Sequence, residues 1–353
     1  MNAILTVNAG SSSLRAHVVD PGGLRVLDEE HVEHPADSPE AREALGALLE
    51  RMTEPVAVGH RLVHGGASVV APSLVDDDVV AALREVASIA PLHVPNSLAL
   101  LDFLRDRLPG VPHVVCPDTA FHADLPEHAR RYALPREWTE RWGLRRFGFH
   151  GLSYAWALRR ATELLERPSW ELNLLIAHLS GGCSVCAVRD GHSVDTSMGF
   201  TPLEGPAMST RSGTVDPGML LWLLQDDRLS LDELDEGLHR RSGLLGLSGG
   251  RSGDTRDLVR AARAGDESAQ LAMDVFNHRV RRELGAVAAS LDRLDALVLT
   301  GDISNNQPEV AEALCAGLGV LGVGERVPLL IVEAREELQL AYETARVVNT
   351  TSG

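Results

Sequence analysis

The chain contains no lysine, so all 33 of its basic side chains are arginine. A Walker A loop needs a lysine on the β- and γ-phosphates, and its absence excludes that kind of nucleotide site. Covalent catalysis through a lysine Schiff base is excluded for the same reason. Any phosphate group must therefore be held by arginine side chains, backbone N–H groups and small hydroxyl side chains.

Long apolar runs are missing as well. No segment approaches the ~20 consecutive apolar residues that a membrane-spanning helix needs. The N-terminal apolar run is interrupted by Asn8 and Gly10 before it reaches the length of a signal peptide. The formal net charge of -17 would repel nucleic acid and anionic membranes. We therefore expect a cytoplasmic enzyme with no membrane partner and no nucleic-acid partner.

Cysteine is scarce, with Cys116, Cys183, Cys186 and Cys315 as its four occurrences. Cys183 and Cys186 form a C-x-x-C pattern, but the surrounding sequence predicts a strand, in which residues three apart point to opposite faces. No second C-x-x-C and no nearby histidine pair completes a zinc set. We expect all four cysteines to be reduced and structural.

One pattern occurs twice in the chain. Residues 4–20 (ILTVNAGSSSLRAHVVD) and 174–191 (LLIAHLSGGCSVCAVRDG) both read as an apolar strand, a Gly/Ser turn and a second strand, and Asn8 superposes on His178. Such a turn lets backbone N–H groups approach an anion closely. Each turn alone fits an ordinary hairpin. Their repetition predicts a duplicated nucleotide-binding architecture with its ligand between the two halves.

Strand-like and helix-like segments alternate around these turns. Strands are predicted at 56–63, 113–117 and 296–302, and helices at 77–90, 266–292 and 336–348. A further helix is predicted at 96–108, with Asn96 as its N-cap and a Pro-Gly stop after it. Together with the length of 353 residues, this pattern predicts an α/β protein of two domains.

Charged side chains occur where predicted strands end. Arg61 and His64 end one strand beside a pair of glycines, and Asp118 follows another. His150 lies between aromatic and glycine neighbours, and Arg211 closes a segment rich in Gly and Pro. A lone arginine or histidine of this kind is typically structural. In α/β enzymes, however, strand ends carry the chemistry, and these cationic groups beside paired anion loops favour phosphoryl transfer.

The motifs that hold these residues resemble those of the acetate and propionate kinases, which are ATP-dependent carboxylate kinases of the actin, hexokinase and heat-shock-ATPase superfamily. They are VNAGSSSL (7–14), GHRLVHGG (59–66), APLHVP (90–95), DTAFH (118–122), RRFGFHG (145–151), VDTSMGFTPLEG (194–205), TRSG (210–213), SGLLG (242–246) and EELQLA (336–341). The resemblance runs from end to end. It implies an α/β fold of two duplicated ribonuclease H-like domains, 1–147 with 337–353 and 148–336, with an active-site cleft between them.

The resemblance implies a catalytic role for five residues. Arg61 and Arg211 match the pair that binds the carboxylate and the planar phosphoryl group in the transition state. His150 matches the hydrogen-bonding stabiliser of that group. Asp118 matches the family's catalytic Asp, and His93 matches another active-site His.

Sites for the remaining components are implied in the same way. The residues that match the pocket for a short acyl chain are Val63, Leu92, Phe149 and Pro202. Glu336, with Asn8, matches the side chains associated with Mg²⁺. The residues that match the binding site for ATP and ADP are Asn8, Ser11, Ser13, His178, Gly181, Gly182, Asp254, Thr255, Arg256, Gly301, Asp302 and Asn306.

The chain departs from the family mostly on the nucleotide side. Where members usually read H-L-G-N-G, residues 178–182 read H-L-S-G-G and lack the phosphate-contacting Asn. Where members usually read G-G-I-G-E-N, residues 301–306 read G-D-I-S-N-N, so Asp302 adds bulk and a negative charge.

Three hypotheses about function follow. The leading one is an ATP- and Mg²⁺-dependent kinase of a small carboxylate, acting as the homodimer that the resemblance implies. The second keeps the same acyl chemistry with a different donor, such as pyrophosphate. The third is a non-catalytic protein that binds a carboxylate or an acyl phosphate. Acetate, propionate, butyrate and more specialised acceptors all fit the sequence.

Overall fold

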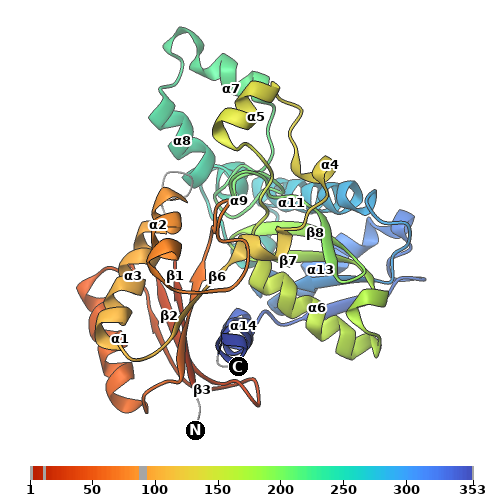
Figure 1. Cartoon of the computed structure of the whole chain (residues 1–353). Helices are drawn as coiled ribbons and strands as arrows, with labels where there is room; N and C mark the ends of the chain where they lie inside the picture. The colour runs from red at the N-terminus through yellow and green to blue at the C-terminus, as the bar shows by residue number, and fades with distance from the viewer. Residues whose placement is uncertain (1–2, 11–12, 87–93, 352–353) are drawn as a thin grey trace. The chain divides into compact units, whose positions relative to one another are not determined.

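The computed structural model of the chain (Figure 1) describes residues 3–10, 13–86 and 94–351. It divides into two compact units. The first contains Met1–Ala123, Phe149–Trp156 and Arg335–Gly353, and the second contains Asp124–Gly148 and Ala157–Ala334. The domain bounds implied by the family resemblance stay a prediction.

The first unit is built on a six-stranded sheet in the order β3-β2-β1-β4-β6-β5. The strands are β1 (Ile4–Ala9), β2 (Leu14–Asp20), β3 (Arg25–Val32), β4 (Ala57–Leu62), β5 (Ser73–Leu74) and β6 (His113–Pro117). Strands β1, β2 and β3 form an antiparallel meander, while β4 and β6 run parallel to β1. The strands predicted at 56–63 and 113–117 are confirmed. Almost every residue of β1, β4 and β6 is buried, as expected for parallel strands covered on both faces.

Helices cover both faces of this sheet (Figure 1). They are α1 (Pro39–Arg51), α2 (Asp77–Val86), α3 (Val94–Arg107), the 3₁₀ turn η1 (Asp118–His122), the start of α6 (Gly151–Leu165) and α14 (Glu336–Thr351). Leu45 of α1 and Leu104 of α3 pack with Val7 in one buried cluster. Leu340 of α14 packs with Val114 in another. These clusters fix the sheet, and with it the strand ends that carry the candidate site.

The start of α3 corrects one prediction. The helix is described from Val94 onward, so Asn96 lies within the helix and is not its N-cap. The predicted helix at 77–90 is present as α2, and the residues that follow Val86 lie outside the described part of the chain.

The second unit is built on a five-stranded sheet in the order β11-β10-β7-β8-β9. The strands are β7 (Asn173–Leu179), β8 (Cys183–Arg189), β9 (His192–Thr196), β10 (Ala296–Thr300) and β11 (Leu329–Val332). Strands β7, β8 and β9 form an antiparallel meander, and β10 and β11 run parallel to β7. Cys183 and Cys186 both lie on β8 as buried free thiols.

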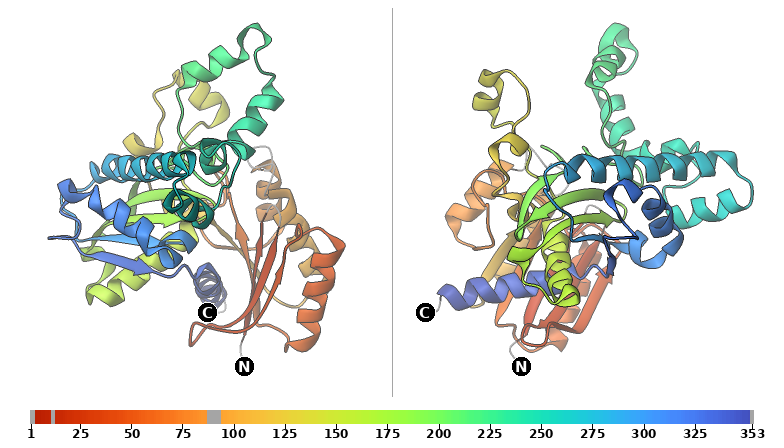
Figure 2. Two further views of the ribbon diagram at one scale, coloured as in Figure 1. Left: turned by 180° about the vertical axis from the view of Figure 1, so that it is seen from behind. Right: turned by 90° about the vertical axis from the view of Figure 1, so that its right-hand side faces the viewer.

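Most of the remaining helices belong to the second unit (Figure 2). They are α4 (Glu127–Arg130), α5 (Arg136–Trp142), the rest of α6, α7 (Pro217–Leu224), α8 (Leu231–Arg240), α9 (Gly243–Leu247), α10 (Thr255–Arg263), α11 (Glu267–Ala288), α12 (Asp302–Asn306) and α13 (Pro308–Ala316), with short 3₁₀ turns η2 (Ser169–Glu171), η3 (Gln225–Asp227) and η4 (Gly319–Leu321). Asp266 caps α11 by accepting from the Ala269 N–H. Phe276, Val280 and Leu284 of α11 are buried.

The two sheets share one topology. Each has an antiparallel meander whose first strand pairs with a later parallel strand, and a further parallel strand follows that one. In the first sheet the register sets Asn8 of β1 beside Arg61 of β4, and in the second it sets His178 of β7 beside Thr300 of β10. The predicted duplication, with Asn8 equivalent to His178, is therefore confirmed.

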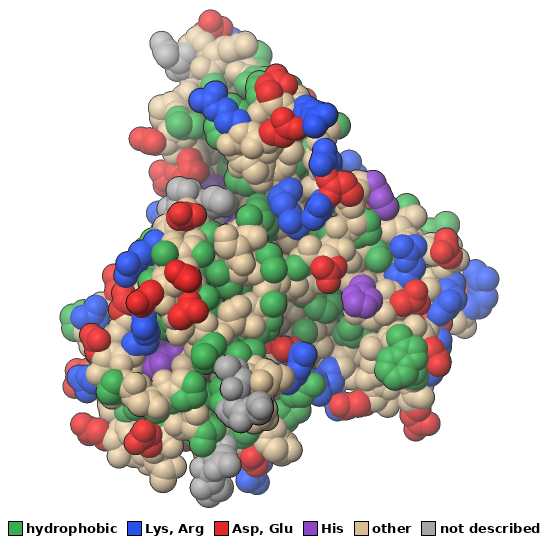
Figure 3. Space-filling view, viewed as in Figure 1, with side chains coloured by type: hydrophobic (Ala, Val, Ile, Leu, Met, Phe, Trp, Pro, Cys, Tyr) green, Lys and Arg blue, Asp and Glu red, His purple; other side chains and the backbone are tan. Residues whose placement is uncertain are grey.

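The surface mixes charges of both signs. On the face of the molecule that Figure 3 shows, arginine and carboxylate side chains are interspersed. Within the described residues, no helix combines the length and the apolar character that a membrane crossing requires.

Candidate active site

In the first unit, predicted site residues from two strands, a 3₁₀ turn and a helix meet at one end of the sheet. Arg61 ends β4, and its guanidinium donates to both oxygens of Asp118, from Nε to Oδ1 at 3.3 Å and from Nη2 to Oδ2 at 2.7 Å. Its Nη1 donates to Oδ1 of Asn8 at 3.0 Å. Glu336, at the start of α14, lies 3.8 Å from the Arg61 Nε. The structure thus brings together four residues that the sequence analysis selected.

Asp118 and Arg61 are largely buried, and their burial affects the pKa of both side chains. The Asp118 side chain is 1% exposed and that of Arg61 is 17% exposed. Burial raises the pKa of the Asp118 carboxyl above its ordinary value, against the opposing effect of the Arg61 guanidinium. Burial alone would lower the pKa of Arg61, but Asp118 and Glu336 raise it overall. Arg61 is therefore a permanent cation in a fixed orientation.

The oxygens of this cluster fit a magnesium ion. Asn8, Asp118 and Glu336 supply an amide and two carboxylates, which are the hard ligands that Mg²⁺ takes alongside substrate phosphates and water. The described residues contain no group of three or more His, Cys, Asp or Glu side chains that would hold a metal by themselves. A magnesium ion here would accordingly depend on a bound phosphate for some of its ligands.

The segment before α6 brings two more predicted residues to Asp118. His150 adopts a left-handed backbone conformation with φ 60°, which is uncommon for a residue other than glycine and is concentrated at functional sites. The next residue is Gly151, and this position requires glycine because a Cβ there would collide with the Asp118 carbonyl oxygen. The Phe149 and His64 rings meet in a T-shaped arrangement, with ring centroids 5.5 Å apart, and the Phe149 carbonyl lies 3.0 Å from the His122 Nε2.

The other predicted residues of this unit are placed as follows. Ser13 lies directly before β2, and its carbonyl accepts from the Gly10 N–H at 2.8 Å. Val63 is half-buried directly after β4. The predictions for Ser11, Leu92 and His93 lie outside the described residues.

Arg211, in the second unit, contrasts with Arg61. It is half-buried, and its Nη1 donates to the carbonyl of Pro202 at 3.1 Å. Among the described residues, no carboxylate pairs with it within 4.0 Å. Burial lowers the pKa of Arg211 from its ordinary value. A partly desolvated cation without a counter-charge favours the binding of an anion.

A network that the sequence analysis did not assign holds the segment around Pro202. The Tyr132 hydroxyl donates to Glu204 Oε2 at 2.6 Å and accepts from the Phe200 N–H at 2.9 Å. Arg146 donates to Glu204 Oε1 at 2.9 Å and to the Ser197 carbonyl at 3.0 Å. Arg146 and Glu204 lie in two of the motifs quoted above, and membership of those motifs was the sequence signal that could have selected them. Their partnership follows only from the fold.

A polar cavity of about 260 Å³ opens beside the β7–β8 turn of the second unit. Its lining consists of Ser180, Gly181, Ser209, Gly253, Asp254, Thr255, Arg256, Asp302, Ile303, Asn306 and Gln307. Most of the predicted nucleotide residues of this unit are among them. His178, Gly182 and Gly301 do not line the cavity; His178 ends β7, Gly182 lies in the turn, and Gly301 follows β10.

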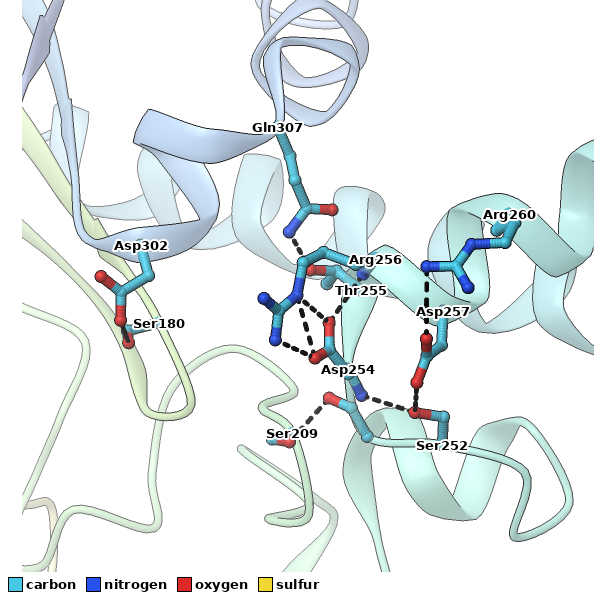
Figure 4. Close-up of polar contacts among 11 residues, drawn as sticks. Ser180, Ser209, Ser252, Asp254, Thr255, Arg256, Asp257, Arg260, Asp302 and Gln307 are labelled. Carbon is cyan, nitrogen blue, oxygen red and sulfur yellow. Dashed lines mark hydrogen bonds and ion pairs between the residues drawn. The ribbon is translucent and has the colours of Figure 1, made fainter. Parts of the chain in front are cut away.

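Polar contacts organise two sides of this cavity (Figure 4). On one side Asp254 caps α10 by accepting from the Arg256 N–H at 2.8 Å, and it also accepts from that residue's Nε and Nη2. The Gln307 amide donates to the Thr255 hydroxyl at 2.5 Å. On the other side the Ser180 hydroxyl donates to Asp302 Oδ2 at 3.2 Å. The side chains leave hydroxyl, amide and carboxylate groups available to a ligand.

Two sheets of this shared topology, with an arginine at one strand end and a hydroxyl-rich cavity at the equivalent end of the other, define a phosphotransferase of duplicated ribonuclease H-like units. A profile of the Acetokinase family matches residues 3–347. The chain therefore belongs to that family.

Individual relatives agree with this assignment. The chain is 49% identical to an acetate kinase of Synechococcus over 278 residues, which is 79% of this chain and 68% of the relative. Among solved structures, it is similar to a propionate kinase from Francisella tularensis, with a TM-score of 0.91, 31% identity, and coverage of 98% of this chain and 100% of that one. It is also similar to the acetate kinase of Porphyromonas gingivalis, with a TM-score of 0.90, 32% identity, and coverage of 99% and 100%.

Proposed function

We propose that this protein is a short-chain carboxylate kinase, similar to acetate kinase, that transfers the γ-phosphoryl group of ATP reversibly to a small carboxylate. The observation that carries the proposal is the cluster of Asn8, Arg61, Asp118 and Glu336 at the strand ends of the first sheet. It presents a fixed cation and the ligands of a metal at one place. Membership of the Acetokinase family supports the same activity.

The proposed step is a direct displacement. A carboxylate oxygen of the acceptor forms a bond to the γ-phosphorus, and the bond from that phosphorus to the bridging oxygen of ADP breaks. The acceptor is ionised at neutral pH, so no side chain has to remove a proton from it. Asp118 therefore need not act as a general base. Its bidentate contact instead holds the Arg61 guanidinium in the orientation that meets a carboxylate or phosphoryl group.

Transition-state charge spreads over the equatorial oxygens of the transferred group, and positively charged side chains stabilise it there. We assign this role to Arg211, because its guanidinium has no carboxylate partner among the described residues. We assign a hydrogen-bonding role to His150 on the basis of its strained backbone. Bound Mg²⁺, held by Asn8, Asp118 and Glu336, would neutralise charge on the donor phosphates.

The acyl chain would be short. We propose Val63 and Phe149 of the first unit as residues that contact it, with the Phe149 ring in T-shaped contact with the His64 ring. A pocket of this kind separates acceptors that differ by one methylene by only ~1–3 kcal/mol. We therefore expect acetate and propionate both to be accepted, at different rates. Because ATP and such acids are metabolites of the cytoplasm, we propose that location.

We further propose that the protein is a homodimer whose contact includes α7. Its apolar sequence PGMLLWLL has no buried residue, and Leu221 and Trp222 are 64% and 54% exposed. An exposed apolar surface of this kind is typical of an interface. Light scattering should give twice the chain mass of 38.0 kDa, and Leu221→Asp should give the single mass. A monomer for the unchanged protein at micromolar concentration would contradict the proposal.

The activity is tested by incubating the purified protein with Mg²⁺, a donor and a carboxylate, and by trapping the acyl phosphate as its hydroxamate. The donors are ATP, GTP and pyrophosphate, and the acceptors are acetate, propionate and butyrate. We expect ATP-dependent product with acetate or propionate. Product from pyrophosphate alone would support the second hypothesis, and no product from any pair would support a non-catalytic binding protein.

A further inference from the structure

Helix α14 packs directly against β4 at Gly59, which lies in the middle of that strand (Figure 1). A Cβ at Gly59 would collide with the Thr344 hydroxyl oxygen and would lie 3.3 Å from Cγ of Leu340. All three residues are buried. Gly59 does not have a positive φ, so the need for glycine at this position is steric and not conformational. The helix approaches the strand this closely because residue 59 has no side chain.

The atom that a side chain would meet is held in place. The Thr344 hydroxyl donates to the Leu340 carbonyl at 2.7 Å, and the Thr344 side chain is fully buried. Rotating the hydroxyl away would break this buried hydrogen bond. Leu340 also packs with Val114 and Leu152 in the buried cluster described above, which resists a sideways shift of the helix. A side chain at residue 59 would consequently push α14 away from the sheet.

The facing sides of β4 and α14 carry two residues of the candidate site. Arg61 follows Gly59 by two residues, so both point to the same face of the strand. Glu336 precedes Leu340 by four residues and Thr344 by eight, so the three lie along one face of the helix. The Glu336 carboxylate lies 3.8 Å from the Arg61 Nε. The contact at Gly59 therefore sets how near the start of α14 comes to Arg61.

We propose that Gly59 is a positioning residue: because it has no side chain, α14 brings the Glu336 carboxylate close enough to Arg61 to act as a ligand of the metal at this site. The proposal rests on the proposed kinase function and deepens it, since it explains how one of the assigned metal ligands is held. Gly59 itself contacts neither the substrate nor the metal. Residues that orient metal ligands typically contribute roughly ten- to hundredfold to metal affinity.

The test uses Mn²⁺, which takes the same oxygen ligands as Mg²⁺. Its binding to the full chain is measured in the presence of ADP through the relaxation enhancement of water protons, with Mn²⁺ and ADP alone as the blank. We expect Gly59→Ala to bind Mn²⁺ about tenfold more weakly than the unchanged protein. We also expect faster hydrogen exchange in the peptide that covers residues 336–345, because the helix is held less tightly.

Two double variants separate positioning from a general loss of stability. Thr344→Ala removes the atom with which the new Cβ collides, so Gly59→Ala/Thr344→Ala should regain the Mn²⁺ affinity and the exchange rate of Thr344→Ala. Glu336→Gln should weaken Mn²⁺ binding about as much as Gly59→Ala, because it removes the charge of the positioned ligand. Since both changes act through one carboxylate, Gly59→Ala/Glu336→Gln should bind Mn²⁺ no more weakly than Glu336→Gln.

Two other glycine variants are matched controls. Gly46→Ala makes the same change on α1, where the added Cβ would meet no other described segment within 4 Å, and it should leave Mn²⁺ affinity unchanged. Gly191→Ala, in the β8–β9 turn, should be destabilising because φ is 81° there and the new Cβ would lie 3.3 Å from the Ser169 Cβ. It should lower the midpoint of urea unfolding and leave the Mn²⁺ affinity unchanged.

The outcomes separate this proposal from the proposed function. Equal Mn²⁺ affinity in Gly59→Ala and the unchanged protein overturns the role of Gly59, and so does an equal loss in Gly191→Ala. If Gly59→Ala does not fold, Gly59→Ala/Thr344→Ala must fold and bind Mn²⁺ as Thr344→Ala does; otherwise the collision is not the cause and the proposal is overturned. If the unchanged protein itself binds no Mn²⁺ with ADP, the proposed function fails and this proposal fails with it. A loss confined to Gly59→Ala and reversed by Thr344→Ala supports the proposal.

Discussion

The ends of β4 and β10 occupy equivalent places in two sheets of one topology, yet they present opposite charges. The end of β4 carries Arg61, which register places beside Asn8. The equivalent position of β10 is the buried Thr300 beside His178, and the next charged residue is Asp302. The end of β4 thus presents a cation that is paired with Asp118, and the end of β10 leads to a carboxylate that accepts from the Ser180 hydroxyl. The shared topology fixes where these strand ends lie within each sheet, and the few residues at each end decide its charge.

The turns of the two hairpins differ in the same way. The first spans residues 10–13 and closes with the Gly10 N–H donating to the Ser13 carbonyl at 2.8 Å. The second spans residues 180–182 and closes with the Ser180 N–H donating to the Gly182 carbonyl at 3.2 Å. In the second turn the Ser180 hydroxyl also donates to Asp302, the first residue of α12, which follows β10.

The largest effect should come from Arg61→Ala, which removes the cation from the first strand end. Turnover should fall on the order of 100-fold or more because a charge-assisted contact to the reacting group is lost. Unfolding free energy should fall by about 3–5 kcal/mol, because Asp118 is left as a buried charge without its partner. Steady-state rates and urea unfolding measure the two effects.

The pH dependence of that loss has a definite sign. Without Arg61 the pKa of Asp118 rises further, because burial raises it and the guanidinium that opposed burial is gone. An acid with a raised pKa in the folded state loses stability as pH rises above its unfolded pKa of about 3.9. The destabilisation of Arg61→Ala should therefore grow between pH 4 and pH 7. The double variant Arg61→Ala/Asp118→Asn should be more stable than Arg61→Ala but equally inactive. If it is not more stable, the unpaired Asp118 charge is not the cause of the lost stability.

Arg211→Ala sharpens the contrast between the two arginines. Turnover should again fall about 100-fold, because the proposed transition-state contact is lost. Stability should change little, since Arg211 leaves no carboxylate unpaired when it is removed. The same two measurements apply. A loss of stability as large as that of Arg61→Ala would show that Arg211 is structural, and full turnover would refute its proposed role.

Glycine substitutions compare the two turns directly. Gly301→Ala should destabilise by about 1–3 kcal/mol, because φ is 94° there and a Cβ meets the Leu179 carbonyl. Gly10→Ala should cost less, since its Cβ would lie 3.1 Å from Ser13 atoms and no positive φ is required. Thermal unfolding of both variants tests the difference. If both variants lose the same stability, the backbones of β7 and β10 can move apart at little cost to admit the added Cβ.

The smallest effect is expected for Glu204→Gln. The amide keeps an acceptor for Tyr132 but loses the ion pair with Arg146, which is worth about 1 kcal/mol for a half-exposed partner. If this network positions Pro202 and Arg211, KM for the carboxylate should rise more than kcat falls. Tyr132→Phe serves as the comparison, because it removes one hydrogen bond and no charge. A stability loss with unchanged KM would leave Glu204 a purely structural residue.

Sequence patterns and motif resemblance selected Arg61, Asp118, Asn8 and Glu336, and these four meet in the structure. They missed the Tyr132–Glu204 contact, whose partners are separated by 72 residues. Asn96 was misplaced as a cap, because Asn is a strong cap signal, whereas the helix already includes Val94 and Pro95. Local signals of this kind compete, and only the packed helix shows which one prevails.

The sequence by itself determined the repeated strand-turn-strand pattern, the exclusion of lysine-based phosphate sites and the family to which the motifs point, since all three depend on residue identity and short-range order. The tertiary structure decided which polar groups became partners. Arg61 reaches Asp118 across 57 residues of chain, and Ser180 reaches Asp302 across 122. Such contacts follow from sheet register and strand order, which bring distant segments within hydrogen-bonding distance. No local periodicity encodes those partners, because it specifies only which face of an element is buried.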